Sequence, residues 1–122
     1  MKNISEYSLI PDLNENDKRL PTFRKQIIKR GFDDTELWSL DVTIAKFILP
    51  RLKRFRKITI GSPIGYDGKT DNHKKWKKML KKMIFSFDKI ANENYEPHSK
   101  KTRKKINKGL KLFYKYYHSL WD

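Results

Sequence analysis

The chain has 122 residues, with 29 Lys or Arg and 14 Asp or Glu, so its formal net charge is +15. It contains no cysteine, which excludes a disulfide scaffold, a thiolate metal site and a cysteine nucleophile. Hydrophobic residues make up 37% of the chain, too much apolar content for a disordered basic tail, so we expect one folded domain over residues 1–122.

The basic residues are concentrated in the C-terminal two-thirds of the chain. Residues 1–41 contain 7 basic and 8 acidic side chains, whereas residues 42–122 contain 22 basic and 6 acidic ones. Such a concentration of charge attracts anions, so we expect a polyanionic partner. No long uncharged apolar run occurs, and residues 1–20 lack the apolar centre of a signal peptide. We therefore expect a cytoplasmic protein that does not bind membranes.

The first thirty residues predict little regular structure. Residues 1–20 show no helical or strand period, and we expect them to form an irregular N-terminal arm. Residues 22–30 predict a short helix, because Pro21 suits the start of a helix and Gly31 suits its end.

A long helix is predicted over residues 34–57. Asp33 and Glu36 have the spacing of a capping box, which marks a helix N-terminus. Pro50 lacks a backbone N–H and predicts a kink inside this helix. Apolar side chains cover more than half of the helix circumference, which is typical of a central helix packed on two sides or of a helix shared with another subunit. We therefore expect a homo-oligomer.

Two further long helices are predicted, over residues 71–92 and 100–120, each with an apolar face and a lysine-rich face. Phe85 interrupts the lysine-rich face of the first of these helices. An aromatic ring within a basic face either stacks on a nucleobase or contacts another part of the protein. Together these elements predict an all-α, single-domain helical bundle of three long helices, one short helix and the N-terminal arm.

No catalytic pattern is found. The three histidines, His73, His98 and His118, do not have metal-ligand spacing. No serine lies in a G-x-S-x-G turn. Gly68-Lys69-Thr70 ends a segment that has Pro63 where a phosphate-binding loop needs its first glycine. We expect a protein that is not an enzyme and has no catalytic residue, metal ion or cofactor.

One candidate site surrounds Arg51, which lies on the apolar arc of the helix predicted over residues 34–57. A charge in such a position needs a partner. A guanidinium in a pocket between helices can bind an anion, although the same side chain can also reach solvent at the bend. Aromatic side chains would line such a pocket. The candidate ligand-binding residues are Arg51, Trp38, Asp41, Arg54 and Tyr117.

A second candidate site consists of the lysine-rich faces of the helices predicted over residues 71–92 and 100–120. Lysine contacts phosphates without reading base sequence. Lysines outnumber arginines in these helices, which favours neutralisation of a phosphate backbone over recognition of bases. The candidate polyanion-binding residues are Lys74, Lys78, Lys81, Lys82, Phe85, Lys104, Lys108 and Lys111.

The middle of the chain also carries a distinctive motif. It consists of GFDDTELWSLD at residues 31–41, then Ile44-Ala45, Phe47-Ile48, Leu52 and Phe55, and later Gly61-Ser62-Pro63, Trp76, Leu80, Met83-Ile84 and Phe87. Over residues 31–90 these positions resemble a family of small, largely uncharacterised proteins encoded by bacteriophages. The lysine-rich C-terminal helix is not part of the resemblance. The resemblance implies a viral protein that acts in the host bacterial cytoplasm.

From these features we expect a non-enzymatic binding protein of phage type that captures an anionic nucleotide, such as a sponge for a nucleotide signal of anti-phage defence. One alternative is sequence-independent binding of DNA or RNA through the lysine-rich helix faces. Another is inhibition of a host defence protein through an acidic surface of that protein. The expected partners are thus an anionic nucleotide, a nucleic acid or a host defence protein, together with further copies of this chain.

Overall fold

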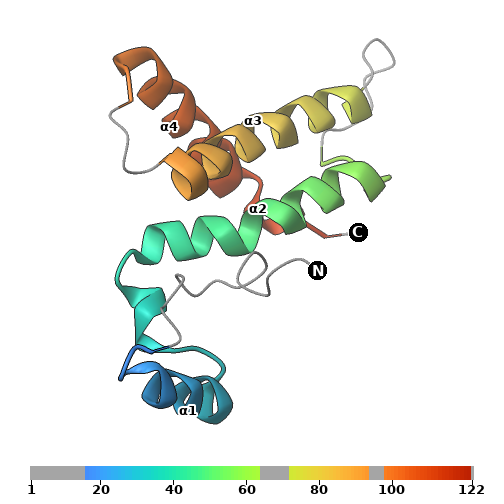
Figure 1. The fold of residues 1–122 in the computed structure, drawn as a ribbon. Coiled ribbons are helices and arrows are strands. Elements are labelled where there is room, and N and C mark those ends of the chain that lie inside the picture. The colour runs from blue at the N-terminus through green and yellow to red at the C-terminus, as the bar shows by residue number, and fades with distance from the viewer. Residues whose placement is uncertain (1–15, 64–71, 94–97, 122) are drawn as a thin grey trace.

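The computed structural model describes residues 16–63, 72–93 and 98–121. Within these ranges the regular structure is entirely helical, which confirms the predicted all-α fold class for the described part of the chain (Figure 1). The elements in chain order are α1 (Leu20–Arg30), η2 (Asp34–Leu37), α2 (Leu40–Ile58), α3 (Asn72–Glu93), α4 (Lys100–Lys115) and η3 (Tyr117–Ser119). Most of the predicted N-terminal arm, residues 1–20, lies outside the described residues. None of the described helices is both long enough and apolar enough to cross a membrane.

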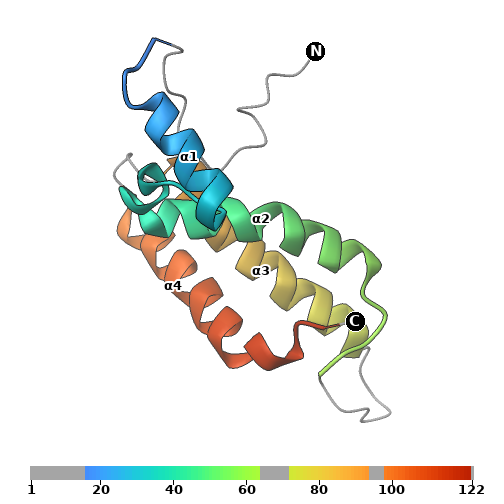
Figure 2. The same ribbon diagram turned by 90° about the horizontal axis from the view of Figure 1, so that it is seen from below.

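Helix α3 is the central element of the fold. Both α2 and α4 pack against it, and Figure 2 shows α3 between them. Their shared core contains a tryptophan, a methionine, a phenylalanine and several aliphatic side chains. Its buried members are Ala45, Leu49 and Leu52 of α2 and Trp76, Leu80, Met83 and Phe87 of α3. Partly buried side chains of α4, among them Leu110 and Phe113, pack against this cluster, and burial of the apolar area holds the three helices together.

Of the two alternatives for the helix of residues 34–57, packing on two sides within one chain is not what the structure shows, and a helix shared with another subunit stays a prediction. Helix α2 buries one stripe of side chains, which consists of Val42, Ala45, Leu49 and Leu52. A second apolar stripe stays about half exposed, with Leu40 at 48%, Ile44 at 47% and Phe47 at 46% of their accessible surface. The sequence pattern shows how many apolar side chains a helix has. It does not show how many of its faces a neighbouring helix covers.

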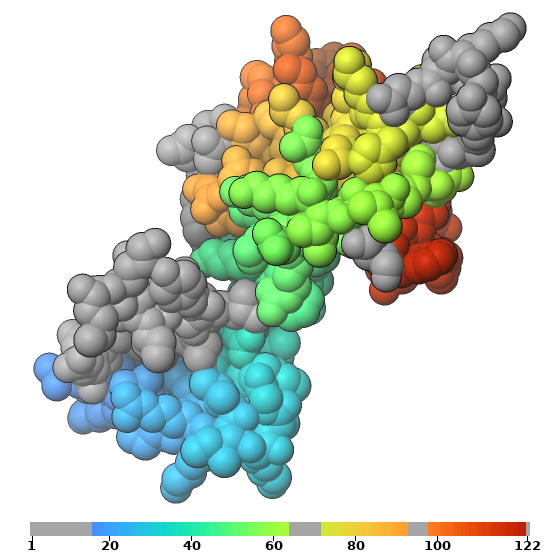
Figure 3. All heavy atoms as spheres, turned by 90° about the vertical axis from the view of Figure 1, so that its right-hand side faces the viewer, coloured from blue at the N-terminus to red at the C-terminus, as the bar shows by residue number. Residues whose placement is uncertain are grey.

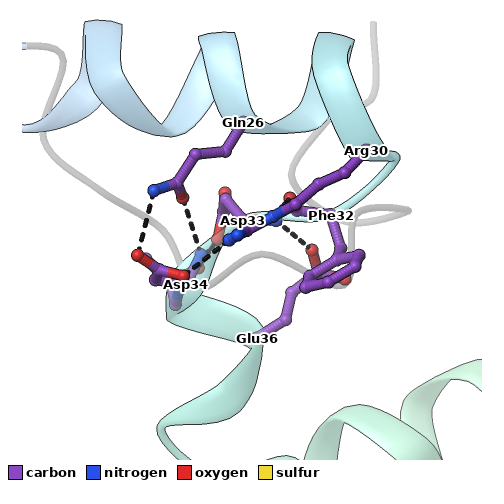
Figure 4. Close-up of polar contacts among 7 residues, drawn as sticks. Gln26, Arg30, Phe32, Asp33, Asp34 and Glu36 are labelled. Atoms are coloured by element: carbon purple, nitrogen blue, oxygen red, sulfur yellow. Dashed lines mark hydrogen bonds and ion pairs between the residues drawn. The ribbon is translucent and has the colours of Figure 1, made fainter.

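The predicted capping box forms, but it caps a short 3₁₀ helix. Figure 4 shows this region between α1 and η2. The Asp33 carboxylate accepts a hydrogen bond from the Thr35 backbone N–H at 2.8 Å, and the Glu36 carboxylate accepts one from the Asp33 backbone N–H at 2.8 Å. These two bonds satisfy backbone donors that a helix N-terminus leaves without partners.

The predicted continuous helix is interrupted at Trp38 and Ser39. Its first turn is η2, and α2 begins only at Leu40. The Trp38 ring packs edge-to-face on Phe23 of α1, with 6.0 Å between ring centroids, and the Arg19 guanidinium lies 5.3 Å from it. The backbone leaves helical geometry at Ser39, with φ −138° and ψ 73°, directly after the residue that packs on α1.

Pro50 lies inside α2 without ending it. Figures 1 and 2 show the axis of α2 bending about midway along the helix, as expected where a proline removes one backbone hydrogen bond. Helix α4 ends at Lys115, earlier than the predicted residue 120, and is followed by the short helix η3. There the Tyr116 ring packs on Trp76 of α3, with 5.6 Å between ring centroids.

Helix α1 and η2 form one end of the molecule, and Figure 3 shows them set apart from the packed helices α2, α3 and α4. Of the described helices, α1 packs only against η2. The Gln26 amide donates to the Asp34 carboxylate at 2.9 Å, and Arg30 forms an ion pair with the same carboxylate. These polar contacts fix α1 to η2.

Candidate polyanion-binding site

The basic residues of the chain are densest on α3 and α4. Helix α3 contains seven lysines, and α4 contains seven lysines and one arginine. The only acidic residues in these two helices are Asp88 and Glu93, both near the C-terminal end of α3. Where these two helices lie close together, lysine side chains of both can face the same pocket with few carboxylates nearby.

A glycine and a serine allow α3 and α4 to approach closely. Gly109 of α4 is buried against α3, and a Cβ atom at this position would lie 2.9 Å from Ser86 Cβ and still closer to Ser86 Oγ and the Lys82 carbonyl oxygen. The Ser86 hydroxyl donates to the Ile106 carbonyl of α4 at 2.7 Å. Glycine at this crossing therefore lets one backbone contact the other helix directly.

This close crossing forms a pocket of about 400 Å³ between α3 and α4, which we call the lysine pocket. Its lining combines five lysine side chains with one aromatic ring. The lining residues are Lys78, Lys81, Lys82 and Phe85 of α3 and Lys105 and Lys108 of α4. No ion pair joins any of these five lysines to a carboxylate of the described residues. The pocket therefore has a strongly positive rim.

The mutual repulsion of these ammonium groups affects Lys82. The pKa of Lys82 is held below its ordinary value, chiefly by the charge of Lys108. Loss of hydration, direct contact with the Lys108 side chain and the charge of Lys78 lower this pKa further. A lowered lysine pKa means that the folded protein disfavours the charged form. An anion placed between Lys82 and Lys108 would remove that penalty.

Phe85 differs from the other aromatic residues of α3 because it does not pack against the core. Trp76 and Phe87 belong to the core cluster, whereas Phe85 neither belongs to this cluster nor packs against it. Within the described residues its ring contacts no other aromatic ring, and its one recorded ring contact is the Lys89 ammonium, 5.6 Å from the ring centroid. The half-buried ring instead lines the lysine pocket.

The structure brings together five of the eight residues predicted to bind a polyanion, namely Lys78, Lys81, Lys82, Phe85 and Lys108. The other three are exposed on the same two helices but do not line the pocket; they are Lys74, Lys104 and Lys111. Lys105 lines the pocket but was not among the predicted residues. Gly109 and Ser86 were also not predicted, although small residues at internal helix positions are a sequence signal for a close helix crossing.

The residues predicted to bind a small ligand do not form one site. Arg51 and Tyr117 line a groove of about 560 Å³ between α2 and α4, and the other side chains of that groove are almost all apolar. Asp41 and Arg54 are exposed on α2 and do not line the groove. Trp38 instead packs near α1. The three helical turns that separate Asp41 from Arg51 keep these side chains apart.

Arg51 already has partners within its own helix. Its guanidinium donates to the Phe47 carbonyl oxygen at 2.8 Å and lies 3.8 Å from the centroid of the Phe47 ring. This stacking orients the guanidinium along α2, and the cation–π contact stabilises it there. An anion entering the groove would have to compete with both contacts.

A comparison of the chain with models of known protein families, with curated proteins and with solved structures finds no match. Its function is therefore inferred from its own residues. No group of three or more His, Asp or Glu side chains in residues 16–63, 72–93 and 98–121 is placed to hold a metal ion. The lysine pocket offers an apolar lining of one aromatic ring and lysine carbon stems, surrounded by the positive charges of five lysines.

Proposed function

We propose that this protein binds the phosphate backbone of nucleic acids through the lysine pocket and the basic helix faces around it. The observation that carries this proposal is the cluster itself: five lysines of two helices surround one pocket without a described carboxylate to neutralise them. Like charges that lie close together destabilise a folded chain. Such a cluster is best explained by an anion that comes from outside the chain.

A polymer of phosphates fits this surface better than a single charged group. Helices α3 and α4 together contain 15 basic residues and 2 acidic ones, so the positive surface continues along both helices beyond the pocket. Each lysine that contacts a phosphate releases a condensed counterion, and this release favours binding. Lysine is a flexible point charge, so we expect binding that depends little on base sequence.

Capture of a small anionic nucleotide stays a prediction, as does inhibition of a host defence protein. The groove that Arg51 and Tyr117 line supports nucleotide capture less well than the lysine pocket, because it has one cation against five, and that cation, Arg51, already contacts Phe47. The lysine pocket would also attract a mononucleotide, but a mononucleotide would leave most of the surrounding lysines without a phosphate. The resemblance to phage-encoded proteins and the homo-oligomer stay predictions too.

The test is a binding titration against a labelled single strand, a duplex of the same sequence and a set of linear and cyclic nucleotides. We expect both polymers to bind at low salt, with a logarithm of affinity that falls linearly with the logarithm of salt concentration. The double variant Lys82→Gln/Lys108→Gln should weaken binding by about tenfold or more and reduce the salt slope by about 1 to 2.

The matched control is Lys25→Gln/Lys29→Gln. It removes the same charge from exposed positions of α1, which packs only against η2 among the described helices. We expect this control to bind almost as tightly as the original protein. The proposal fails if the two double variants weaken binding equally, or if neither polymer binds at low salt. Salt-resistant binding of one small nucleotide would support nucleotide capture instead.

A further inference from the structure

Resting on the proposed function, we infer that the lysine pocket takes an unpaired nucleotide, with its base stacked on Phe85 and its phosphate between the lysines of α3 and α4. The preferred ligand is then a single strand and not a duplex. The inference concerns the Phe85 ring in the lining of the pocket, whereas the proposed function depends on the lysine charges around it.

The first argument is that, in the described part of the chain, Phe85 does not contribute to the hydrophobic core. Phenylalanine is a large apolar residue that usually contributes to a core. Here the ring packs neither on the core cluster nor on another aromatic ring. It lies half-buried among lysines, where its apolar surface gains little from the rest of the protein.

The second argument is the combination of groups that line the pocket. A nucleotide has a flat apolar base joined to a negative phosphate. The lysine pocket, of about 400 Å³, has a mainly apolar lining made by the Phe85 ring and the carbon stems of five lysines, whose charges surround it. Proteins that bind single strands combine an aromatic platform for bases with cations that follow the backbone. Both parts of a nucleotide therefore find complementary groups here.

The third argument explains why a single strand should bind more tightly than a duplex. In a duplex the bases are stacked and paired inside the helix, so their faces are not free to stack on the Phe85 ring. The outer phosphates of a duplex can still contact the lysine rim. The charged rim therefore binds both forms, and the Phe85 ring adds affinity only for a strand with an unpaired base.

The size of the added affinity determines how large an effect the experiment must detect. Stacking of one base on an aromatic side chain is worth about 1–3 kcal/mol by alanine substitution, which corresponds to a factor of about 5 to 150 in affinity. We therefore expect Phe85→Leu to weaken binding of a single strand by about fivefold or more and to leave duplex binding almost unchanged. Leucine keeps an apolar side chain of similar length but has no flat face.

The matched control is Phe32→Leu. The Phe32 ring is 40% exposed, and the Arg30 guanidinium lies 4.5 Å from its centroid. Phe32 is thus a second exposed aromatic residue beside a cation, but it lies next to α1 and away from α3 and α4. The ligands are a single strand, the same strand with abasic sites, and its duplex. In the original protein the abasic strand should bind about as weakly as the single strand binds to Phe85→Leu.

Phe85→Trp provides a readout that does not depend on affinity. The introduced indole should stack on a base, so a single strand, but not the abasic strand, should quench the fluorescence of this variant more than that of the original protein, which has three tryptophans of its own. Circular dichroism checks that each variant keeps its helices. The inference is overturned if single strand, abasic strand and duplex bind equally, or if Phe85→Leu behaves like Phe32→Leu. Equal binding with intact dependence on Lys82 and Lys108 would overturn this inference alone, whereas loss of all polymer binding would overturn the proposed function.

Discussion

Replacing Gly109 with alanine adds one methyl group at the closest approach of α3 and α4. The new Cβ would lie 2.9 Å from Ser86 Cβ and much closer than van der Waals contact to Ser86 Oγ and the Lys82 carbonyl oxygen. A serine hydroxyl can rotate away, but a backbone carbonyl cannot. The two helices must therefore separate, and the hydrogen bond from Ser86 to the Ile106 carbonyl must lengthen or break.

The expected loss of stability combines three effects. Overpacking of a tight contact costs about 1–3 kcal/mol. Loss of one hydrogen bond costs about 1 kcal/mol more. Alanine is a better helix former than glycine by about 1 kcal/mol, which offsets part of this cost. We therefore expect Gly109→Ala to lower the free energy of unfolding by about 1–3 kcal/mol, which for a chain of this length lowers Tm by about 4–12 °C.

Thermal and urea unfolding, followed by circular dichroism, measure this effect. Gly61→Ala is the control, because nothing lies within 4 Å of a Cβ added at the exposed Gly61. This control should unfold like the original protein. Separation of α3 and α4 also moves Lys82 away from Lys108, so Gly109→Ala should weaken nucleic-acid binding. If Gly109→Ala is as stable as the control, or more stable, the two helices do not approach as closely as the reasoning requires.

Three further predictions follow from charges and caps. Lys108→Gln should stabilise the protein by about 0.2–0.5 kcal/mol at neutral pH because it removes a like charge from Lys82, while weakening nucleic-acid binding. This gain should shrink at alkaline pH, because the pKa of Lys82 is lower in the folded than in the unfolded chain, so Lys82 loses its proton and the repulsion disappears as the pH rises. A urea titration at neutral pH that gives Lys108→Gln and the original protein the same stability would contradict this prediction. Asp33→Ala should cost about 1–2 kcal/mol in urea unfolding because it removes a buried cap, whereas Asp33→Ser should cost less. Hydrogen bonds from Arg19 lower the pKa of Asp17 to about 2. The stability from this pair is therefore present above the ordinary aspartate pKa of about 3.9 and is lost as the pH falls toward 2. NMR titration of the Asp17 carboxyl should give a midpoint near pH 2 in the original protein and a higher midpoint in Arg19→Gln.

The helical periods of the sequence predicted most of the secondary structure. The helix predicted over residues 71–92 is α3 shifted by one residue, and the helix predicted over residues 22–30 is α1 with two more residues at its start. These elements are predictable because helix starts, stops and amphipathic faces depend on neighbouring residues. The capping box at Asp33 was predicted for the same reason. Its place at the start of a 3₁₀ helix was not, because the periodic pattern does not show the break at Ser39, beside which Trp38 packs on Phe23 of α1.

The candidate site was only partly predictable. Lysine periodicity placed Lys78, Lys81 and Lys82 on one face of α3, together with Phe85. No pattern along one helix shows which residue of another helix lies opposite. That Lys82 lies close to Lys108 is therefore a result of the packing of α4 against α3. The same limit explains why Arg51, Trp38 and Asp41 were grouped by residue type and spacing, although the structure places them apart.

By itself the sequence determined the charge, the all-α class and the faces of the helices, since each follows from composition or from the 3.6-residue period of a helix. Tertiary structure decided that α3 is central, that α2 leaves an apolar stripe exposed, and that α4 crosses α3 at Gly109 and Ser86. The physical reason is that packing depends on the shape of both partners. Gly109 and Ser86 permit a close helix crossing only because they lie opposite each other on two helices. At this crossing lysines of α3 and α4 line one pocket together with Phe85.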